Sequence, residues 1–443
     1  MEIALIIIFV LGYLAITLEH SLKIDKLIPA LAMMALMWAL ISVAHLPVYE
    51  VDTILKELNP SHLDEILLHH LGKTAEIIIF LLGAMTIVEI IDYFDGFATI
   101  KGFINTKSKQ TLLFIFSILA FVLSAIIDNL TATIVLITIL QKVIQNRDTR
   151  IWFAGLIIIA ANAGGAWSPI GDVTTTMLWI GNKVTTIKLI QYLLVPSLIC
   201  MIVPVALATT LPAFKGNIDE EVAHIKPKTN KHGAPMFYLG LSAIVFVPVF
   251  KTFTHLPPYV GMMLSLAVVA TFAEYYSSAK INISNIDEDH QEGSSHSPVH
   301  NSLSKIELPS ILFFLGILLA VAALESLGIL FEFAGSLNAA IPNSDIVVMF
   351  LGIGSAIIDN VPLVAASMGM FSEPIDNPLW HFIALSAGTG GSMLIIGSAA
   401  GVVAMGMEKI DFFWYLKKIS WLAFAGFTSG LISFVIMRNF IIL

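Results

Sequence analysis

The chain has 443 residues, of which 57% are hydrophobic and only 12% are charged. One soluble core could not hide that much apolar surface, so the composition predicts a polytopic integral membrane protein in a lipid bilayer. The formal net charge is −9 and much of it lies in polar loops, so no nucleic-acid partner is expected. The sequence contains no Walker motif and no Cys/His cluster, which leaves ATP-driven pumping and redox coupling without support. Neither enzymatic activity nor a cofactor is expected.

Eight apolar runs are long enough to cross about 30 Å of hydrocarbon as helices. The first lacks a basic leader and a cleavage site, which predicts a retained helix rather than a signal peptide. Between the second and third runs, the segment Glu50–Leu71 is amphipathic and is predicted to lie on the outer surface. The eight runs cover residues 2–19, 27–45, 75–95, 188–211, 235–250, 258–277, 308–330 and 415–440.

The hexapeptide Ser-Ala-Ile-Ile-Asp-Asn occurs twice, at Ser124–Asn129 and Ser355–Asn360. Each copy places an aspartate inside apolar sequence, where a carboxylate is costly and generally functional. The repeat predicts two related halves, each with a hairpin around the hexapeptide, at about 110–145 and about 345–370.

Basic residues indicate the orientation of the two hairpins. Both flanks of the first are basic, so both of its ends are predicted to be cytoplasmic and the segment re-entrant. The flanks of the second contain acidic residues but no Lys or Arg, so it is predicted to enter from the opposite side. The first flanks contain Lys101, Lys107, Lys109, Lys142, Arg147 and Arg150, and the second contain Asp345, Glu373 and Asp376.

The same rule organises the whole chain. With the N-terminus outside, the strongly basic loops fall on one face, and Lys183, Lys188 and Arg438 are exceptions. The fold class is therefore an all-α polytopic membrane protein of two inverted-topology repeats, each with about five crossings, a re-entrant hairpin and a broken helix. Both termini are predicted to be extracytoplasmic. The repeats are predicted at residues 1–211 and 235–443, joined by a cytoplasmic linker at 212–234.

Each half also contains an apolar stretch interrupted by glycines, at about 151–186 and about 380–407. In the first, Gly164, Gly165, Pro169 and Gly171 should break the helix and place Asp172 close to a helix start. Asp172 is then either a ligand or only an N-cap, since Gly-Asp followed by Thr is a good cap in any protein. Thr174, Thr175 and Thr176 either face a ligand or bond back to their own helix. The second stretch has Ser392, and Ser398 where the first has Asp172.

The hairpin tips offer oxygen atoms of the kind that hard monovalent cations prefer. Irregular backbone at membrane depth is tolerated only around a cavity or an ion. The alternative is a helix interior whose polar groups bond to neighbouring helices. Candidate ligands are Ser124, Asp128, Asn129 and Thr131 in the first tip, and Ser355, Asp359 and Asn360 in the second, where Val361-Pro362 replaces Leu-Thr.

Two further observations concern the transported ligand and the path of the proton. No Lys or Arg lies in either hairpin tip or glycine break, so no paired charge is predicted for a di- or tricarboxylate. Glu325 aligns with Asp92 and is either a proton-relay group or an interfacial, solvated carboxylate.

The repeated Ser-Ala-x-x-Asp-Asn, together with Asn-Ala-Gly-Gly-Ala-Trp-Ser-Pro-Ile-Gly-Asp-Val-Thr-Thr-Thr at residues 162–176, resembles the NhaD-type sodium/proton antiporters of the ion transporter superfamily. The resemblance covers nearly the whole chain. It implies exchange of Na⁺, and often Li⁺, for H⁺ across a bacterial cytoplasmic membrane, a role in pH homeostasis, and a homodimer. The positions that it implicates are Ser124, Asp128, Asn129, Asn162, Asp172, Thr174, Thr175, Ser355, Asp359, Asn360, Ser392 and Ser398.

The mechanism expected from these residues is competition between a proton and a cation for midplane aspartates, coupled to movement of the hairpins. Na⁺ is expected at Asp128, Asn129 and Asp172, with the first hairpin as the principal site. Candidate proton carriers are Asp128, Asp359, Asp172 and Glu325. The alternatives are a sodium-coupled di- or tricarboxylate symporter, an oxyanion carrier of the arsenite type, and a channel or non-transporting scaffold.

Overall fold

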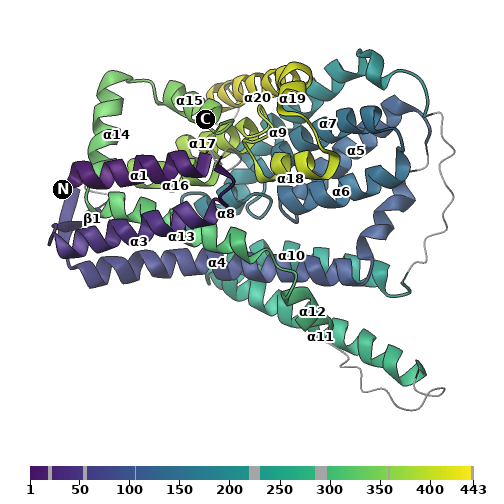
Figure 1. The fold of residues 1–443 in the computed structure, drawn as a ribbon, viewed down its shortest axis with the longest axis horizontal. Coiled ribbons are helices and arrows are strands. Elements are labelled where there is room, and N and C mark those ends of the chain that lie inside the picture. The colour runs from purple at the N-terminus through teal and green to yellow at the C-terminus, as the bar shows by residue number, and fades with distance from the viewer. Residues whose placement is uncertain are drawn as a thin grey trace.

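The computed structural model describes residues 1–17, 22–52, 57–104, 106–218, 230–284, 297–357 and 360–440. This part of the chain is mostly helical (Figure 1). Seven of its helices are long and apolar enough to cross a membrane, which confirms the prediction of a multi-span helical protein. They are α4 (Leu63–Tyr93), α7 (Arg147–Ala166), α9 (Thr186–Thr209), α10 (Gly233–Thr254), α11 (Pro258–Ser284), α13 (Leu308–Ser326) and α20 (Ser420–Phe440).

The remaining helices are shorter. Seven are apolar, namely α1 (Glu2–Thr17), α3 (Leu27–Val43), α5 (Lys109–Ser124), α6 (Asn129–Val143), α15 (Ser344–Gly354), α16 (Asn360–Met370) and α18 (Ala399–Glu408). The others are α8 (Val173–Ile180), α12 (Pro298–Leu303), α14 (Ile329–Ala340), α17 (Pro378–Gly390), α19 (Phe412–Lys418) and the 3-10 helices η1 (Gly96–Phe103) and η2 (Pro212–Phe214).

The segment Glu50–Leu71 contains more than one element: strands β1 (Val48–Asp52) and β2 (Glu57–Ser61) form an antiparallel pair, and α4 begins directly afterwards. The span predicted at 75–95 is therefore the second part of a 31-residue helix. Asp64 and Glu65 in the first turn favour the earlier start, since acidic groups stabilise a helix N-terminus. The place of Glu50–Leu71 on the outer surface stays a prediction.

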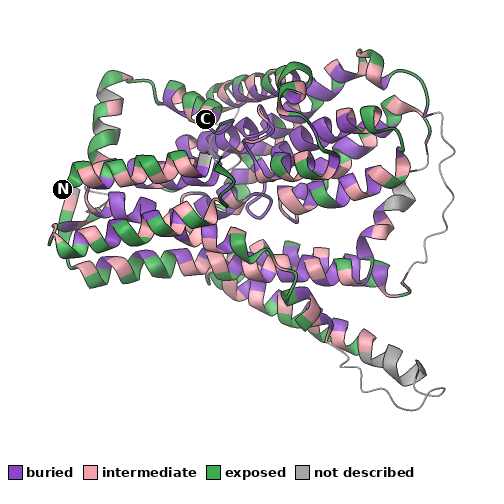
Figure 2. Ribbon diagram, in the orientation of Figure 1, coloured by how far each residue is buried: buried purple, intermediate pink, exposed green. Residues whose placement is uncertain are grey.

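The helices form two neighbouring groups. In Figure 1, α4, α10 and α11 run along the lower edge, and α5, α7, α9 and α20 lie above them. Helix α7 is the most enclosed of the long helices. In its most apolar 18-residue stretch 83% is buried, against 33% in that of α10 and 28% in that of α11. Figure 2 shows the same difference in colour. Helix α7 is thus surrounded by protein, while α10 and α11 present their apolar side chains to the surroundings.

Each hexapeptide lies between the end of one helix and the start of the next. Helix α5 ends at Ser124 and α6 begins at Asn129, while α15 ends at Gly354 and α16 begins at Asn360. Helices α15 and α16 have 11 residues each, or about 16 Å, and cannot cross a bilayer. The glycine-rich stretches are interrupted as predicted, between Ala166 and Val173 and between Gly390 and Ala399.

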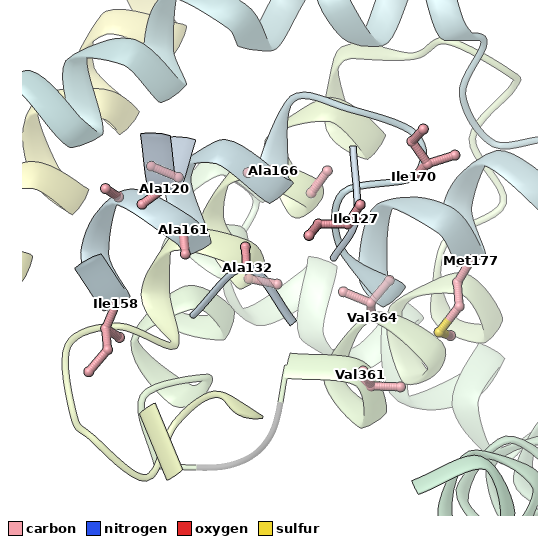
Figure 3. Close-up of a cluster of buried hydrophobic side chains, with 14 of the residues drawn as sticks. Ala120, Ile127, Ala132, Ile158, Ala161, Ala166, Ile170, Met177, Val361 and Val364 are labelled. Carbon is pink, nitrogen blue, oxygen red and sulfur yellow. The ribbon is translucent and has the colours of Figure 1, made fainter. Parts of the chain in front are cut away.

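Small residues let these elements pack closely. Alanines from α5, α6 and α7 meet in the cluster of Figure 3, which also contains Ile127 and Val361. A Cβ atom at Gly164 would lie 2.2 Å from the backbone oxygen of Phe121, so only glycine allows α7 this close to α5. The hairpin tips are thereby held against the interruptions in α7–α8 and α17–α18. The division into two inverted repeats at residues 212–234 stays a prediction.

Candidate functional site

Asp172 is the residue on which the two hairpins converge. It precedes α8 in an extended conformation, and its Oδ1 accepts a hydrogen bond from the backbone N–H of Thr174 at 3.0 Å. Its Oδ2 accepts bonds from Asn129 Nδ2 at 3.0 Å and from Asn360 Nδ2 at 3.3 Å. Asp172 is 2% exposed. Asp172 is therefore the predicted N-cap, and it also joins both hexapeptides to the broken helix.

Asn162 links the two interruptions. Its Nδ2 donates to Ser398 Oγ at 3.1 Å and to the backbone oxygen of Ile158, and its Oδ1 accepts from Asn129 at 3.3 Å. Ser398 in turn caps α18 by accepting from the N–H of Gly401. Five predicted site residues thus form one buried network, namely Asn129, Asn162, Asp172, Asn360 and Ser398.

Asp128 has a different environment. Its backbone is in a conformation with φ of +56°, which is uncommon for a residue other than glycine. Both carboxylate oxygens accept bonds from Thr131, one from the backbone N–H and one from the hydroxyl, each at 2.8 Å. Asp128 therefore caps α6 and is half-buried beside the network rather than bonded into it. The strained backbone fixes the direction of its carboxylate.

Several predicted residues bond to backbone instead of to other site residues. Ser124 Oγ donates to Ala161 O at 2.6 Å, and Ser355 Oγ donates to Ala387 O at 3.0 Å, so both serines attach a hairpin to a broken helix. Thr175 bonds back to Asp172 O, and Ser392 to Thr389 O. The buried hydroxyl of Thr174 has no hydrogen-bond partner among the described residues.

Two predicted residues are not placed with the others. Asp359 lies outside the described residues. Glu325 is half-buried near the end of α13 and does not line the cavity described next.

A cavity of about 80 Å³ lies against the network. Asp128, Thr131 and Asp172 contribute polar groups to its lining, and Phe80 and Phe314 belong to its apolar wall. A second cavity of about 310 Å³ is lined by Glu89, Asp92, Asp95 and Lys142, and it shares Val88 and Thr131 with the first.

The apolar wall, Lys26 and Glu307 also line the first cavity, and sequence reasoning did not identify them as site residues. Lys26 and Glu307 each stand directly before an apolar run, which marks the end of a span but does not show what that end faces. Among the described residues, no group of three His, Cys, Asp or Glu side chains could hold a metal ion. The available donor set is therefore one of mixed carboxylate, amide and hydroxyl groups.

Irregular backbone at membrane depth is tolerated only around a cavity or within protein. Interrupted helices and short hairpins around a buried carboxylate are therefore typical of a membrane transporter. The profile of the CitMHS citrate transporter family matches residues 3–380. Sodium/proton antiporter 1 of Arabidopsis thaliana is 43% identical over 99% of this chain and 73% of its own length. The Na⁺/H⁺ antiporter NhaD of Vibrio cholerae is 32% identical over 94% of this chain and 87% of its own length.

The chain therefore belongs to the CitMHS family of membrane transporters, alongside these NhaD-type relatives, and is not an enzyme. This confirms the resemblance drawn from the two hexapeptides. The solved structure of the Alcanivorax borkumensis YdaH transporter aligns with a TM-score of 0.57 over 94% of this chain and 97% of that one. At 12% sequence identity, that likeness shows a shared fold alone.

Proposed function

We propose that this protein exchanges Na⁺ for H⁺ by alternating access, with Asp172 at the centre of the site. The observation that carries the proposal is the pair of hydrogen bonds from Asn129 and Asn360 to one buried carboxylate oxygen. A ligand that binds Asp172 therefore interacts with both hairpins at once. The names of the plant and bacterial relatives support the choice of ions.

The chemistry follows from the amide groups. An asparagine donates through Nδ2 and accepts through Oδ1, so rotating its amide by half a turn replaces a donor by a cation ligand. Asn129 and Asn360 both donate to Asp172 Oδ2 in this structure. In the proposed exchange the proton is carried by the Asp172 carboxyl group. When Na⁺ binds, the amide oxygens turn toward it, the carboxyl O–H ionises and the proton leaves. One carboxylate then serves two competing ligands, and Asp128 adds a second negative charge beside it.

The charges lining the cavity favour a cation over an organic anion. Three carboxylates line it, from Asp128, Asp172 and Glu307, against the single ammonium group of Lys26 among the described residues. The Lys26 ammonium lies 4.6 Å from the centre of the Phe313 ring. A di- or tricarboxylate would therefore meet more like charge than opposite charge. Because the family profile is that of citrate transporters, carboxylate symport is nevertheless the second candidate to test.

The larger arrangement belongs to the same proposal. Residues 1–211 and 235–443 are inverted repeats joined through 212–234, and both termini are extracytoplasmic. The hairpins and broken helices move together against the remaining helices. Asp359, Li⁺ transport, a homodimer and a bacterial cytoplasmic membrane stay predictions drawn from the resemblance.

The test uses everted membrane vesicles from a bacterial host that lacks its own Na⁺/H⁺ antiporters, with an acridine dye reporting the proton gradient. We expect Na⁺ to dissipate the gradient in vesicles that contain the parent protein. Asp172→Asn should abolish this response, since it removes the negative charge that both ions need. Asp64→Asn, in the exposed first turn of α4, is the matched control and should respond like the parent.

Two outcomes would refute the proposal. The first is undiminished Na⁺-dependent proton movement in Asp172→Asn, or in Asp128→Ala combined with Asp359→Ala. The second is no response to Na⁺ alone but Na⁺-dependent uptake of radiolabelled citrate or succinate, which would establish the symporter instead.

A further inference from the structure

The two broken helices are structurally equivalent, and the contacts of their glycines give the register. A Cβ atom at Gly165 would lie 2.6 Å from Gly171 O and 3.1 Å from Asp172 Cβ. One at Gly391 would lie 2.7 Å from Gly397 O and 3.1 Å from Ser398 Cβ. Gly165 therefore matches Gly391, and Asp172 matches Ser398. The same register makes Asn162 in the first half equivalent to Gly388 in the second.

These equivalent positions meet the opposite half of the molecule in the same way. Asn162 Nδ2 donates a hydrogen bond of 3.1 Å to Ser398 Oγ in the opposite half. Ser398 is the position equivalent to Asp172. In the same way, a Cβ atom at Gly388 would point toward the first half and lie 3.9 Å from Asp172 Oδ2. The first half thus has an amide side chain at this position, whereas the equivalent residue of the second half, Gly388, places no side chain beside Asp172.

We propose that Gly388 is a specificity-determining residue: its missing side chain leaves the space beside Asp172 Oδ2 in which the transported cation binds. The inference rests on the proposed exchange function and deepens it. A methyl group at residue 388 would lie 3.9 Å from that oxygen, close enough to compete for space with an ion bound there. The size of residue 388 therefore sets the size of the ion and its remaining water that the site accepts. The buried hydroxyl of Thr174, two residues after Asp172, is a further oxygen ligand for the same ion.

A glycine that serves only helix packing makes different predictions. The nearest neighbour of a Cβ at Gly388 is Ala166 Cβ at 3.3 Å, which is close but not forbidding. If packing were its only role, alanine would lower stability and turnover equally for every ion. If the proposal holds, alanine narrows the site and discriminates between ions by size. The ratio of apparent affinities for Na⁺ and for the smaller Li⁺ separates the two.

The experiment measures Na⁺- and Li⁺-dependent proton movement in vesicles for the parent, Gly388→Ala and Gly406→Ala. Gly406→Ala is the matched control, because it makes the same change in α18, where a Cβ would meet no atom within 4 Å. We expect Gly388→Ala to raise the KM for Na⁺ about fivefold and that for Li⁺ less than about twofold, as a modest steric conflict with the larger ion would. The control should leave both values unchanged.

A second variant tests binding without transport. Gly388→Asn should place in the second half the amide that Asn162 already places in the first, so the chain should fold but lose its cation. Na⁺ should raise the unfolding temperature of the purified parent and leave that of Gly388→Asn unchanged, because a ligand stabilises only a state that it binds.

The inference is overturned if Gly388→Ala changes both KM values by the same factor, or if Gly388→Asn is stabilised by Na⁺ as the parent is. Failure of the exchange proposal is distinguishable from both, because the parent itself would then show no Na⁺-dependent proton movement.

Discussion

At the scale of single residues, Asp172 shows that an N-cap can also bond to side chains from distant segments. Asp172 uses one oxygen for the N–H of Thr174 and the other for two asparagines from distant segments. The sequence offered capping and binding as alternatives, because the motif shows the local partner only. Spacing along the chain cannot reveal that Asn129 and Asn360 approach the same oxygen. The first hairpin as the principal cation site stays a prediction; the structure adds that Thr131 bonds to both carboxylate oxygens of Asp128.

Ser398 gives a prediction at this scale. It caps α18 through the N–H of Gly401 and accepts from Asn162, so Ser398→Ala removes both bonds. We expect a loss of about 1–2 kcal/mol in the free energy of unfolding. Exchange should continue, since Asp172 keeps its partners. Thermal unfolding in detergent, alongside the vesicle assay, checks both parts. Ser398→Thr retains a hydroxyl and should be near the parent, and a Ser398→Ala protein of unchanged stability would contradict the argument.

At the scale of elements, the sequence predicted which helices are interrupted but not how their ends are held. Gly-Gly and Gly-Asp mark the interruptions because they act on the local backbone. The end of α18 depends instead on side chains from the first half. Glu408, whose side chain is fully buried, accepts from Arg150 Nε at 2.9 and 2.8 Å and from Gln141 at 2.9 Å. These bonds hold α18 against α6 and α7, and no periodicity in the sequence points to them.

The pair yields a second prediction. Glu408→Ala leaves the guanidinium of Arg150, only 16% exposed, without its carboxylate, and should destabilise the protein by about 3–5 kcal/mol. Replacing both residues by methionine should cost less, because no buried charge is then left unpaired. Unfolding temperatures of the two variants compare them directly. Equal or greater destabilisation in the double variant would mean that the pair matters through its shape and not through its charge.

At the scale of the whole molecule, the two halves are also joined at a site remote from Glu408. Asp376, just before α17, accepts from the N–H of Thr185 at 2.7 Å and from its hydroxyl at 2.8 Å. Partial burial disfavours the charged form, yet the neighbouring His381 and the bonds from Thr185 hold the pKa of Asp376 below its usual range. Its contribution to stability is therefore present at neutral pH and is lost only in acid, below that range. The sequence predicted two halves from the repeated hexapeptide, but contacts between them depend on residues outside any motif.

The cavities are associated with one end of the membrane-spanning helices. Lys26 and Glu307, which line the first, and Asp92 and Lys142, which line the second, all stand at or near ends of helices predicted to be cytoplasmic. Towards the opposite end, Trp179 of α8 packs edge-on against Phe80, and its backbone oxygen accepts from Lys251 Nζ of α10 at 2.9 Å. The ammonium also lies 4.6 Å from the centre of the Trp179 ring. Lys251 therefore joins the end of α8 to α10, and we expect this contact to keep the site closed at that end.

The last prediction tests this closure. Lys251→Met removes the ammonium but keeps an apolar side chain of similar length, so the end of α8 should separate from α10 more often. The test introduces a cysteine at Val173, which lines the cavity. The rate at which this cysteine reacts with a membrane-impermeant thiol reagent, added from the side of residue 251, is then measured. Lys251→Met should raise this rate several-fold, because the cost of opening falls by the hydrogen bond and the cation–π contact together. The parent is the unreactive control, because its single cysteine, Cys200, is buried. Lys188→Met is the matched control for charge, because it removes a lysine of the same predicted face that does not contact Trp179. A rate that Lys251→Met leaves unchanged, or that Lys188→Met raises equally, would show that Lys251 does not control access.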